Sequence, residues 1–424
     1  MTALHEILTR NQYKSILILF SLAALGFRLT KYLFQNLEVA MNIIFKKQSV
    51  LILILLFLSL ISCGKDKNPT GNNGDNIVYP EAEEQNLDSK VLEELVNELG
   101  KGTYGDVHSL LIMRNDSFVL EKYFSPNPVS VRETLQDIQT VTQAITSTLV
   151  GIAIHQGKIS GVDEKVYNFF PEYSHIFDQD SAKYTITLEH LLTMTAGFAW
   201  TEDIATYWWY GAEDELANMI WCTDGDWIKH VLSRPLFDDP GSRFVYNSGA
   251  TMLLSGIINK ACGLSLEEFA AEYLFKPLGI STWEWETCPK GNSTTFFHLD
   301  LRPLDMLKIG QLYLNKGRWN GVQVVPEEWI NVSTERQVND FDAGIPPIDA
   351  CDHGYLWWRY SDNHPASSML KINDVYFAFG WADQYIWIIP HLNMVVVSTA
   401  SNSNPGTFKT YDIIWKYILR AVKD

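Results

Sequence analysis

The sequence predicts a mixed α/β (α+β) fold in which an antiparallel sheet, flanked by terminal helices, carries a large helical insert. Apolar and β-branched runs gather near the two ends of the folded part, whereas the region between them has mostly helical periodicity. The strand-like runs are His108–Arg114, Phe118–Phe124, Val375–Phe379, Tyr385–Pro390 and Met394–Thr399. We therefore expect both ends of the domain to contribute strands to one sheet.

The first elements of the folded part are predicted to be a helix and a hairpin. In Leu87–Leu99, five apolar residues recur at helical spacing, and glycines follow at 100 and 102. The next two strand-like runs are separated by Asn115 and Asp116, residue types that favour a tight turn. At the other end of the chain, Thr407–Val422 is predicted to form the closing helix.

The middle of the domain is predicted to be mainly helical. Apolar residues repeat there at intervals of three and four, with polar or glycine breaks between the segments. The predicted helices are Leu188–Thr193, Glu213–Cys222, Trp227–Ser233, Ala250–Cys262, Leu266–Leu274 and Pro303–Asn315.

The front of the chain has the features of an export signal. From Met41, a short basic segment with Lys46 and Lys47 precedes the apolar run Val50–Ile61, which is too short to span a membrane. The run ends in Leu-Ile-Ser-Cys-Gly and resembles the lipobox of bacterial lipoproteins, which implies lipidation of Cys63. We expect 1–40 to be an upstream extension, 41–62 the signal peptide, 63–86 a flexible tether, and 87–424 the folded domain.

Composition excludes some classes of partner. The formal net charge is −17, and residues 64–424 hold 27 basic against 48 acidic residues, or −21, so nucleic acid is not expected as a partner. The four cysteines after Cys63 show no metal-ligand spacing, and their disulfide pairing stays open. There is no H-E-x-x-H sequence and no glycine-rich phosphate loop. We expect neither a metal nor another cofactor.

One stretch of the domain, DIQTVTQAITSTLVGIAIHQG at Asp137–Gly157, is predicted to be a buried helix. Its apolar residues recur at helical spacing, and Gly157 supplies a stop. Thr140 and Gln143 stand three residues apart at the entrance of this helix, so their side chains share one face of its first turn.

This stretch resembles the nucleophile helix of the β-lactamase-related serine hydrolases, which include class C β-lactamases, penicillin-binding proteins, esterases and 6-aminohexanoate-dimer hydrolases. The resemblance extends over about residues 87–422. It rests on further blocks in family order, namely LLTMTAGFAW (Leu191–Trp200), PGSRFVYNSGATMLLSGI (Pro240–Ile257), RPLDMLKIGQLYLNKGRWNG (Arg302–Gly321), HGYLWW (His353–Trp358) and FAFGWADQYIWIIP (Phe377–Pro390). It implies an active site between an α/β half and a helical insert.

The resemblance implies a site whose two central residues are replaced. Thr140 stands at the position of the nucleophilic Ser of the family, Gln143 at that of its Lys base, and Tyr246 at that of the Tyr that assists proton transfer. A Gln amide has no useful basicity, and a positioned base is worth roughly 10²- to 10⁴-fold in rate. The replacement therefore predicts impaired catalysis.

The third family motif is matched by Ala378-Phe379-Gly380, where only the glycine is kept. We expect Gly380 to allow close approach of the backbone to a ligand. By resemblance, Trp381 and Thr140 offer the two N–H groups of an oxyanion hole, and Gln384 lies beside them. Asp383 either places a carboxylate beside the pocket or is a solvated turn residue. Trp200, Tyr207–Tyr210, Trp357 and Trp358 are expected at the wall of a cleft or in the core.

A structural interpretation of the same helix start competes with the catalytic one. Thr-x-x-Gln before an apolar helical run is typical of a capping box, in which the Thr hydroxyl and the Gln side chain bond backbone N–H groups. Tyr246 could likewise be a packed loop residue. Both interpretations remain open at the level of the sequence.

Two functional hypotheses follow. The first is a lipid-anchored protein of the bacterial envelope, on the periplasmic or outer-membrane face, with impaired catalysis and a cleft for a peptide, amide or ester-like ligand. The second is an active hydrolase of amide or ester bonds that uses Thr140 with Tyr246.

Overall fold

The structure is a computed structural model that describes residues 81–124, 128–202, 213–338, 351–364, 371–402 and 410–423. These residues all lie in one compact unit, Gly74–Asp424. The predicted signal peptide and Cys63 lie outside the described residues. The last part of the predicted tether contains a short helix, α2 (Glu81–Glu84), in which Ala82 is buried. Within the described ranges, no helix has the length and apolar character needed to span a membrane.

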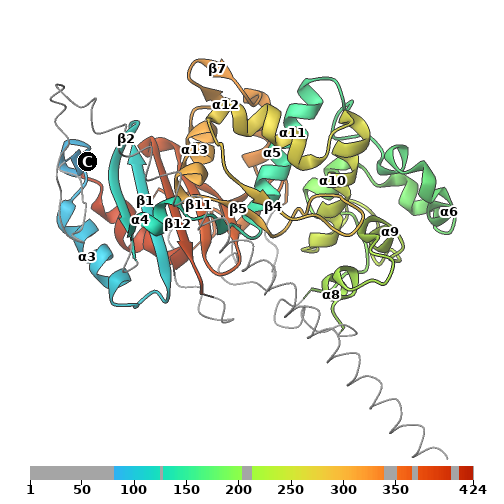
Figure 1. The fold of residues 1–424 in the computed structure, drawn as a ribbon, viewed down its shortest axis with the longest axis horizontal. Helices are drawn as coiled ribbons and strands as arrows, with labels where there is room; N and C mark the ends of the chain where they lie inside the picture. The colour runs from blue at the N-terminus through green and yellow to red at the C-terminus, as the bar shows by residue number, and fades with distance from the viewer. Residues whose placement is uncertain are drawn as a thin grey trace, which may run out of the picture. The chain divides into compact units, whose positions relative to one another are not determined.

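A seven-stranded antiparallel sheet forms one half of the domain, and both ends of the chain contribute to it, as predicted (Figure 1). Its spatial order is β2-β1-β12-β11-β10-β9-β8. The strands are β1 (Val107–Arg114), β2 (Ser117–Tyr123), β8 (Cys351–His353), β9 (Trp358–Tyr360), β10 (Tyr376–Gly380), β11 (Gln384–Ile389) and β12 (Met394–Ala400). The short strands β8 and β9 were not expected from the sequence. The five predicted strands match β1, β2, β10, β11 and β12 to within about one residue at each end.

The hairpin of β1 and β2 forms where the sequence predicts it. Asn115 and Asp116 both have positive φ, at 50° and 61°. Two consecutive residues in this conformation make the tight turn whose twist suits antiparallel strands, and Asn and Asp tolerate it better than other non-glycine residues.

Alternate residues of β1 enter two different cores, because successive side chains of a strand point to opposite faces. Leu110 and Ile112 pack with the terminal helices, whereas Leu111 and Met113 join the core that continues into the helical half. On the second face lies α13 (Pro303–Leu314), whose Gly310 leaves no room for a side chain: a Cβ there would come within 2.4 Å of Val395. The sheet is therefore buried on both faces.

The terminal elements cover the first face of the sheet. Helix α3 (Ser89–Gly100) is capped by Asp88 and buries Leu92, Leu95, Val96 and Leu99. The C-terminal segment was predicted to be one helix. Its described part instead forms three short 3-10 or π turns, η7 (Thr410–Asp412), η8 (Ile414–Ile418) and η9 (Leu419–Ala421). This segment does lie beside the sheet and contacts α3, but its apolar pattern did not determine the hydrogen-bond register.

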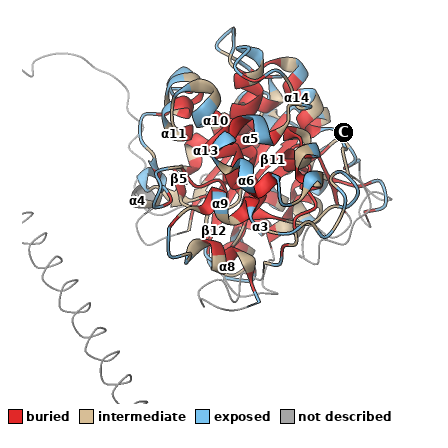
Figure 2. Cartoon of the chain, turned by 90° about the vertical axis from the view of Figure 1, so that its right-hand side faces the viewer, coloured by how far each residue is buried: buried red, intermediate tan, exposed pale blue. Residues whose placement is uncertain are grey.

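The helical half surrounds α5 (Val141–His155), in which every residue from 141 to 153 is buried (Figure 2). Helix α5 contacts β10 and β11 on the sheet side, and α10 and α11 on the helical side. Most of the predicted helices are present. They are α7 (Leu188–Leu192), α8 (Glu215–Ile220), α9 (Trp227–Leu232), α10 (Ser248–Cys262) and α11 (Leu266–Ala270), with α14 (Glu327–Thr334) as an addition.

A small three-stranded sheet, also not predicted, includes the strand that directly precedes α5 in the chain. Its order is β3-β5-β4, with β3 (Gln136–Asp137), β4 (Glu284–Trp285) and β5 (Leu299–Leu301). Strand β5 pairs Asp300 with both Asp137 and Glu284, so three carboxylates stand side by side across it. Strand β3 ends three residues before Thr140 and so fixes the approach of the chain to α5.

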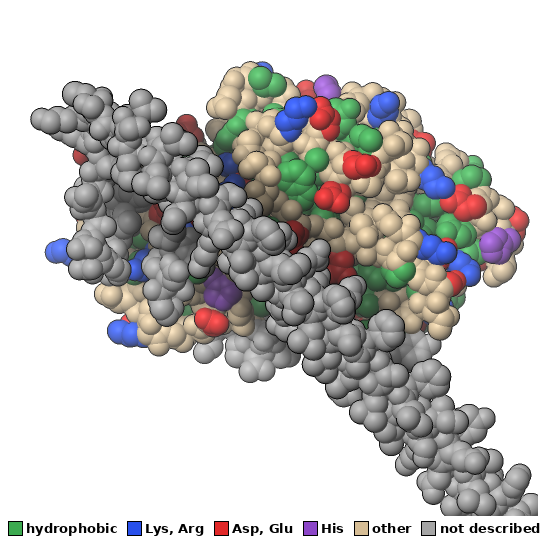
Figure 3. Space-filling view, viewed as in Figure 1, with side chains coloured by type: hydrophobic (Ala, Val, Ile, Leu, Met, Phe, Trp, Pro, Cys, Tyr) green, Lys and Arg blue, Asp and Glu red, His purple; other side chains and the backbone are tan. Residues whose placement is uncertain are grey.

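The surface of the described part carries charges of both signs. On the face shown in Figure 3, Lys and Arg side chains are interspersed with Asp and Glu and do not gather in one patch.

Candidate functional site

The fold brings Thr140, Gln143 and Tyr246 together at the N-terminal end of α5. The Tyr246 hydroxyl donates to Gln143 Oε1 at 3.4 Å, and the side chains of Thr140 and Ser248 also lie close enough to the phenol to lower its pKa. Gln143 is only 2% exposed, and its Nε2 has no hydrogen-bond partner among the described residues. The three predicted residues therefore share one location.

The predicted capping box is wrong. Thr140 has helical φ and ψ angles (−70° and −1°) and makes no side-chain cap bond. The backbone turn before the helix explains why, since Val141 N–H donates to Ile138 O, and Gln143 N–H donates to Thr140 O. With the first N–H groups already satisfied, the Thr140 hydroxyl donates instead to Phe379 O at 3.0 Å.

That hydrogen bond joins the start of α5 to the end of β10. Replacing Thr140 with Ala is expected to lower the free energy of unfolding by about 0.5–1.5 kcal/mol, because the bond to Phe379 O is lost. Thr140→Ser retains the hydroxyl and should be nearly neutral. Urea unfolding of the three proteins tests this, and equal stability of the Ala variant and the wild type would contradict the role of the bond.

Gly380 is required for this approach, although not for the reason predicted. A Cβ at Gly380 would lie 2.4 Å from Ile138 O and 3.1 Å from Gln139 Cβ. The glycine thus allows β10 to approach the protein's own backbone in the turn before Thr140, rather than a ligand. Trp381 follows directly and is half-buried, so the Thr140–Phe379 contact brings the two predicted oxyanion residues to the same edge.

The turn before Thr140 contains a strained residue. Gln139 has φ +52°, in the left-handed region that glycine prefers, at a cost of about 1–2 kcal/mol for other residues. Such outliers persist only where the surroundings hold them, and they gather at functional sites.

Asp383 and Gln384, which follow Trp381, make hydrogen bonds that stabilise the fold. Gln384 is buried, and its Nε2 donates to Ala400 O at 2.6 Å and Ala382 O at 3.2 Å. Asp383 was expected beside the pocket or in a solvated turn, and both expectations are wrong. Asp383 is fully buried, and its Oδ2 accepts a hydrogen bond of 2.7 Å from Asn402.

The three residues Tyr246, Asn247 and Ser248 have different structural roles. Asn247 is the N-cap of α10, where its side chain accepts from Ala250 N–H at 2.7 Å. The cap fixes Tyr246 immediately before the helix. Ser248 binds Glu202 with both its N–H and its hydroxyl, at 2.8 Å each.

Glu202 is the site residue that sequence reasoning missed. Its carboxylate accepts the two bonds from Ser248 and a third from Trp200 Nε1 at 2.7 Å. Burial raises the pKa of Glu202 from its usual range to about 7, and the hydrogen bonds from Ser248 and Trp200 only partly oppose this. No motif marks Glu202; its position two residues after the LLTMTAGFAW block is the only signal in the sequence.

Glu202 should make stability depend on pH. Its raised pKa means that the folded state holds this proton more tightly than the unfolded chain, so stability is lost as pH rises from about 4.5 to about 7. Replacing Glu202 with Gln is expected to flatten this part of the curve. Denaturant midpoints between pH 4 and pH 8 measure it, with the exposed Glu133→Gln as the matched control. An unchanged slope in the Glu202 variant would refute the assignment.

The protonation of Tyr246 also follows from its surroundings. Burial raises the pKa of Tyr246 well above its ordinary value of about 10, and the charge of Glu202 raises it further. The hydrogen bonds to Gln143, Thr140 and Ser248 act in the opposite direction, and among the described residues the groups that affect this pKa most include no Lys, Arg or His. At neutral pH the phenol is therefore a proton donor and not a base.

Aromatic side chains line the sheet side of Tyr246. Trp358 stacks on Tyr246 with ring centroids 6.3 Å apart, and Phe244 and His353 pack against Trp358. Trp200 covers the first turn of α10, where a Cβ on Gly249 would touch its ring. Trp357 belongs to the core with Tyr313. Tyr207–Tyr210 lie outside the described residues.

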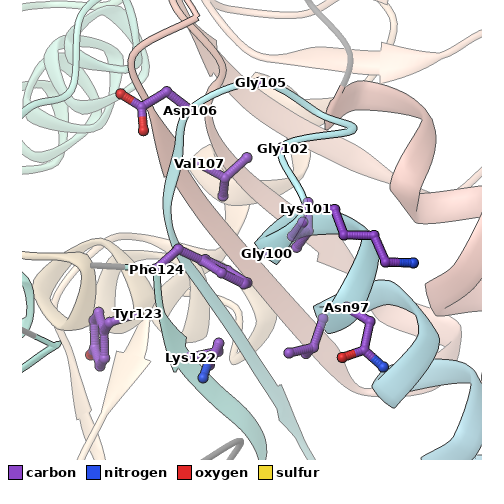
Figure 4. A pocket seen from close by; sticks show the side chains of 12 residues that line it. Asn97, Gly100, Lys101, Gly102, Gly105, Asp106, Val107, Lys122, Tyr123 and Phe124 are labelled. Atoms are coloured by element: carbon purple, nitrogen blue, oxygen red, sulfur yellow. The ribbon is translucent and has the colours of Figure 1, made fainter. Parts of the chain in front are cut away.

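A separate open pocket of about 690 Å³ lies at the β2 edge of the sheet (Figure 4). It is lined by the end of α3, the glycine-containing loop that follows, the start of β1 and the end of β2, with Lys101, Asp106 and Phe124 among its residues. None of the predicted site residues lines it.

Comparison with known proteins shows which family the sequence and the fold resemble. Residues 92–297 match the family model described as Beta-lactamase. A proposed 6-aminohexanoate-dimer hydrolase of Bacillus anthracis has a similar structure, with a TM-score of 0.61 and 19% identity over 78% of this chain and 83% of that one. A proposed β-lactamase of Bacteroides dorei has a TM-score of 0.62 and 17% identity over 80% of this chain and 100% of that one.

A sequence relative is the monacolin J acid methylbutanoyltransferase of Aspergillus terreus. It is 27% identical over 156 residues, which are 34% of this chain and 36% of the relative, so the match spans about a third of each protein. The family model and the shared fold support the family predicted from the sequence, that of the β-lactamase-related serine hydrolases.

Proposed function

We propose that this protein is a lipid-anchored member of the β-lactamase-related serine hydrolases with impaired catalysis, whose cleft binds a peptide, amide or ester-like ligand. The observation that carries the proposal is the position of Gln143. Its side chain meets the Tyr246 hydroxyl where an amine base would be needed, and it brings no positive charge.

The surroundings of Thr140 leave it without an activating group. A hydroxyl is a weak nucleophile until a neighbouring base accepts its proton. Gln143 cannot accept it, and the raised pKa of Tyr246 keeps the phenol protonated. The Thr140 hydroxyl also donates to Phe379 O. Loss of a base costs roughly 10²- to 10⁴-fold in rate, which is why we propose binding without efficient turnover.

The ligand class is inferred from chemistry that the relatives share. Their names refer to hydrolysis of an amide dimer, to β-lactam hydrolysis and to transfer of a methylbutanoyl group. Each involves an acyl carbonyl. Here the N–H groups of Thr140 and Trp381 would receive that carbonyl oxygen, since backbone donors do not depend on the side chains that were replaced.

Labelling with a fluorophosphonate and with a penicillin probe tests the impairment. We expect no adduct, by mass spectrometry, on the wild-type peptide that bears Thr140. Binding is tested separately by the shift in melting temperature with a p-nitrophenyl ester and the matching anilide, with p-nitrophenol and p-nitroaniline as controls that lack the acyl group. A shift with the acyl compounds that the controls lack supports ligand binding; no shift with either acyl compound contradicts it.

The second candidate is an active hydrolase that uses Thr140 with Tyr246. The observation in its favour is that the Tyr246 phenol lies close to Thr140 and could protonate a leaving group. An adduct on the Thr140 peptide, absent from Thr140→Ala, would establish this function and exclude the first.

The lipid anchor has its own test. If Cys63 is lipidated, the wild type should partition with membranes and Cys63→Ser should move to the soluble fraction or remain as uncleaved precursor. Fractionation followed by intact-mass analysis of the N-terminal peptide measures both. A Cys63→Ser protein that keeps wild-type mature mass and membrane recovery would contradict the anchor.

A further inference from the structure

The turn that presents Thr140 is held by a neighbouring carboxylate. Asp137, at the end of β3, accepts the backbone N–H of Gln139 at 2.9 Å and its side-chain Nε2 at 2.6 Å. Both bonds go to the residue with positive φ, so Asp137 directly stabilises the left-handed conformation of Gln139.

Asp137 is in turn held by His298, which precedes β5. The His298 ring Nδ1 lies 2.9 Å from Asp137 Oδ2, and the His298 backbone N–H donates to Asp137 Oδ1 at 2.9 Å. The pair therefore links the small sheet to the turn through two separate contacts. His298 itself has positive φ (55°), which indicates that its position too is imposed by the surrounding structure.

The conformation of Gln139 determines where Thr140 lies. The carbonyl of Ile138, one residue earlier, accepts Val141 N–H and is the backbone group that faces Gly380. The carbonyl of Gln139 accepts Thr142 N–H and the Thr142 hydroxyl. If Gln139 moved to an ordinary conformation, these carbonyls would rotate, and the Thr140 hydroxyl would lose its approach to Phe379.

We propose that Asp137 and His298 are positioning residues of this site, which hold Gln139 in the left-handed conformation and thereby set Thr140 against β10. The inference rests on the proposed function only in that Thr140 is taken as part of the ligand site. Neither residue needs to touch a ligand, because both act through the turn.

The pair should respond to pH. The hydrogen bond to Asp137 raises the pKa of His298, and the charges of Asp137, Glu286 and Asp300 add to this, against the opposing effect of burial. Glu286 faces the other ring nitrogen at 3.4 Å, and Glu284 lies opposite Asp300. Because the folded-state pKa is raised, the ion pair is complete below the ordinary His value of about 6.5 and is lost as pH rises through the higher value.

Asp300 is the other group that titrates nearby. Burial, with the adjacent charge of Asp137, raises the pKa of Asp300 to about 6. Ionisation of Asp300 adds a second negative charge beside Asp137. A variant therefore has to separate the effect of Asp300 on the pH dependence of the turn from that of His298.

The test follows the methyl resonance of Thr140 by NMR in the full-length protein, in detergent micelles and without ligand. The resonance is assigned by its loss in Thr140→Ser. We expect one titration step with a midpoint above pH 6.5, absent from His298→Gln and retained in Asp300→Asn. A step that survives in His298→Gln, or no step in the wild type, would overturn the proposal.

Gln139→Gly provides the matched rescue, since glycine adopts the left-handed conformation without support. Asp137→Asn should displace the Thr140 resonance in the wild-type background, and that displacement should fall at least twofold when Gln139→Gly is added. An equal displacement in both backgrounds would refute the proposal. If Asp137→Asn does not fold, the proposal is tested by the amplitude of the pH-dependent shift of the Thr140 resonance. Gln139→Gly alone should reduce this amplitude at least twofold. Because no ligand is used, failure of the ligand-binding proposal leaves these results unchanged.

Discussion

Changing Thr140 to Ser and Gln143 to Lys together is expected to raise the rate of acyl-enzyme formation with an activated ester by roughly 10²- to 10⁴-fold over the wild type. The amine would stand beside the Tyr246 phenol, where Gln143 Oε1 now accepts its hydrogen bond. The ammonium form of this Lys would lower the pKa of Tyr246, and its neutral amine form would supply the missing base. The backbone donors need no change.

The two substitutions should act as a unit. In Thr140→Ser alone, the Ser hydroxyl has no base and stays protonated. In Gln143→Lys alone, the Thr140 hydroxyl still donates its proton to Phe379 O and not to the new amine. Each single variant should therefore gain far less than the double variant. Stopped-flow release of p-nitrophenol measures the acylation burst. If the wild type already acylates as fast as the double variant, the site is not disabled, and another base must exist.

Replacing Asn402 with Ala is expected to be the most destabilising single change among those considered, at roughly 3–5 kcal/mol. The Asn402 side chain donates to Asp383 Oδ2 and Tyr104 O, both at 2.7 Å, and accepts Asp106 N–H at 2.8 Å. One of these three bonds serves a buried carboxyl group, and leaving a buried polar group without its partner is costly. The turn that follows Trp381 would lose its main side-chain support.

A double-mutant cycle isolates the contribution of the Asp383–Asn402 pair. Asp383→Asn replaces the carboxyl group with an amide and keeps a residue that tolerates the positive φ of 70° at this position. Adding Asn402→Ala in that background should cost less than in the wild type. Guanidinium unfolding provides the free energies. A cost below about 1 kcal/mol for Asn402→Ala, or equal costs in both backgrounds, would contradict the assigned role.

The sheet and most helices were predictable because burial on known faces leaves a periodic pattern in the sequence. Leu110, Leu111 and Ile112 show the limit of this reasoning: all are apolar, and the structure alone assigns them to two cores. The two-residue strands β3 and β4 are too short to have a period. The C-terminal segment was wrong in detail, since apolar spacing does not separate an α-helix from consecutive 3-10 and π turns.

At the candidate site, it was predictable that Thr140, Gln143 and Tyr246 lie together, whereas their contacts were not predictable. Thr-x-x-Gln matches a capping box equally well, and only the backbone turn from Ile138 to Thr140 shows that the N–H groups are already bonded. Glu202 and His298 reach the site from elements far along the chain. No local pattern links Glu202 to Ser248, 46 residues later, or His298 to Asp137, 161 residues earlier.

The two ends of the domain are joined side by side. Leu87 pairs with Val422, Asp88 N–H donates to Ala421 O at 2.7 Å, and Lys423 N–H donates to Asn86 O at 2.8 Å. Strand β1 likewise has β12 as its inner neighbour. During synthesis, β1 therefore remains without this partner until β12 has left the ribosome. Shortened chains that stop before β12 would expose an unpaired, apolar strand edge, and such edges favour aggregation. The protein should consequently tolerate insertions between its helices far better than the loss of β12.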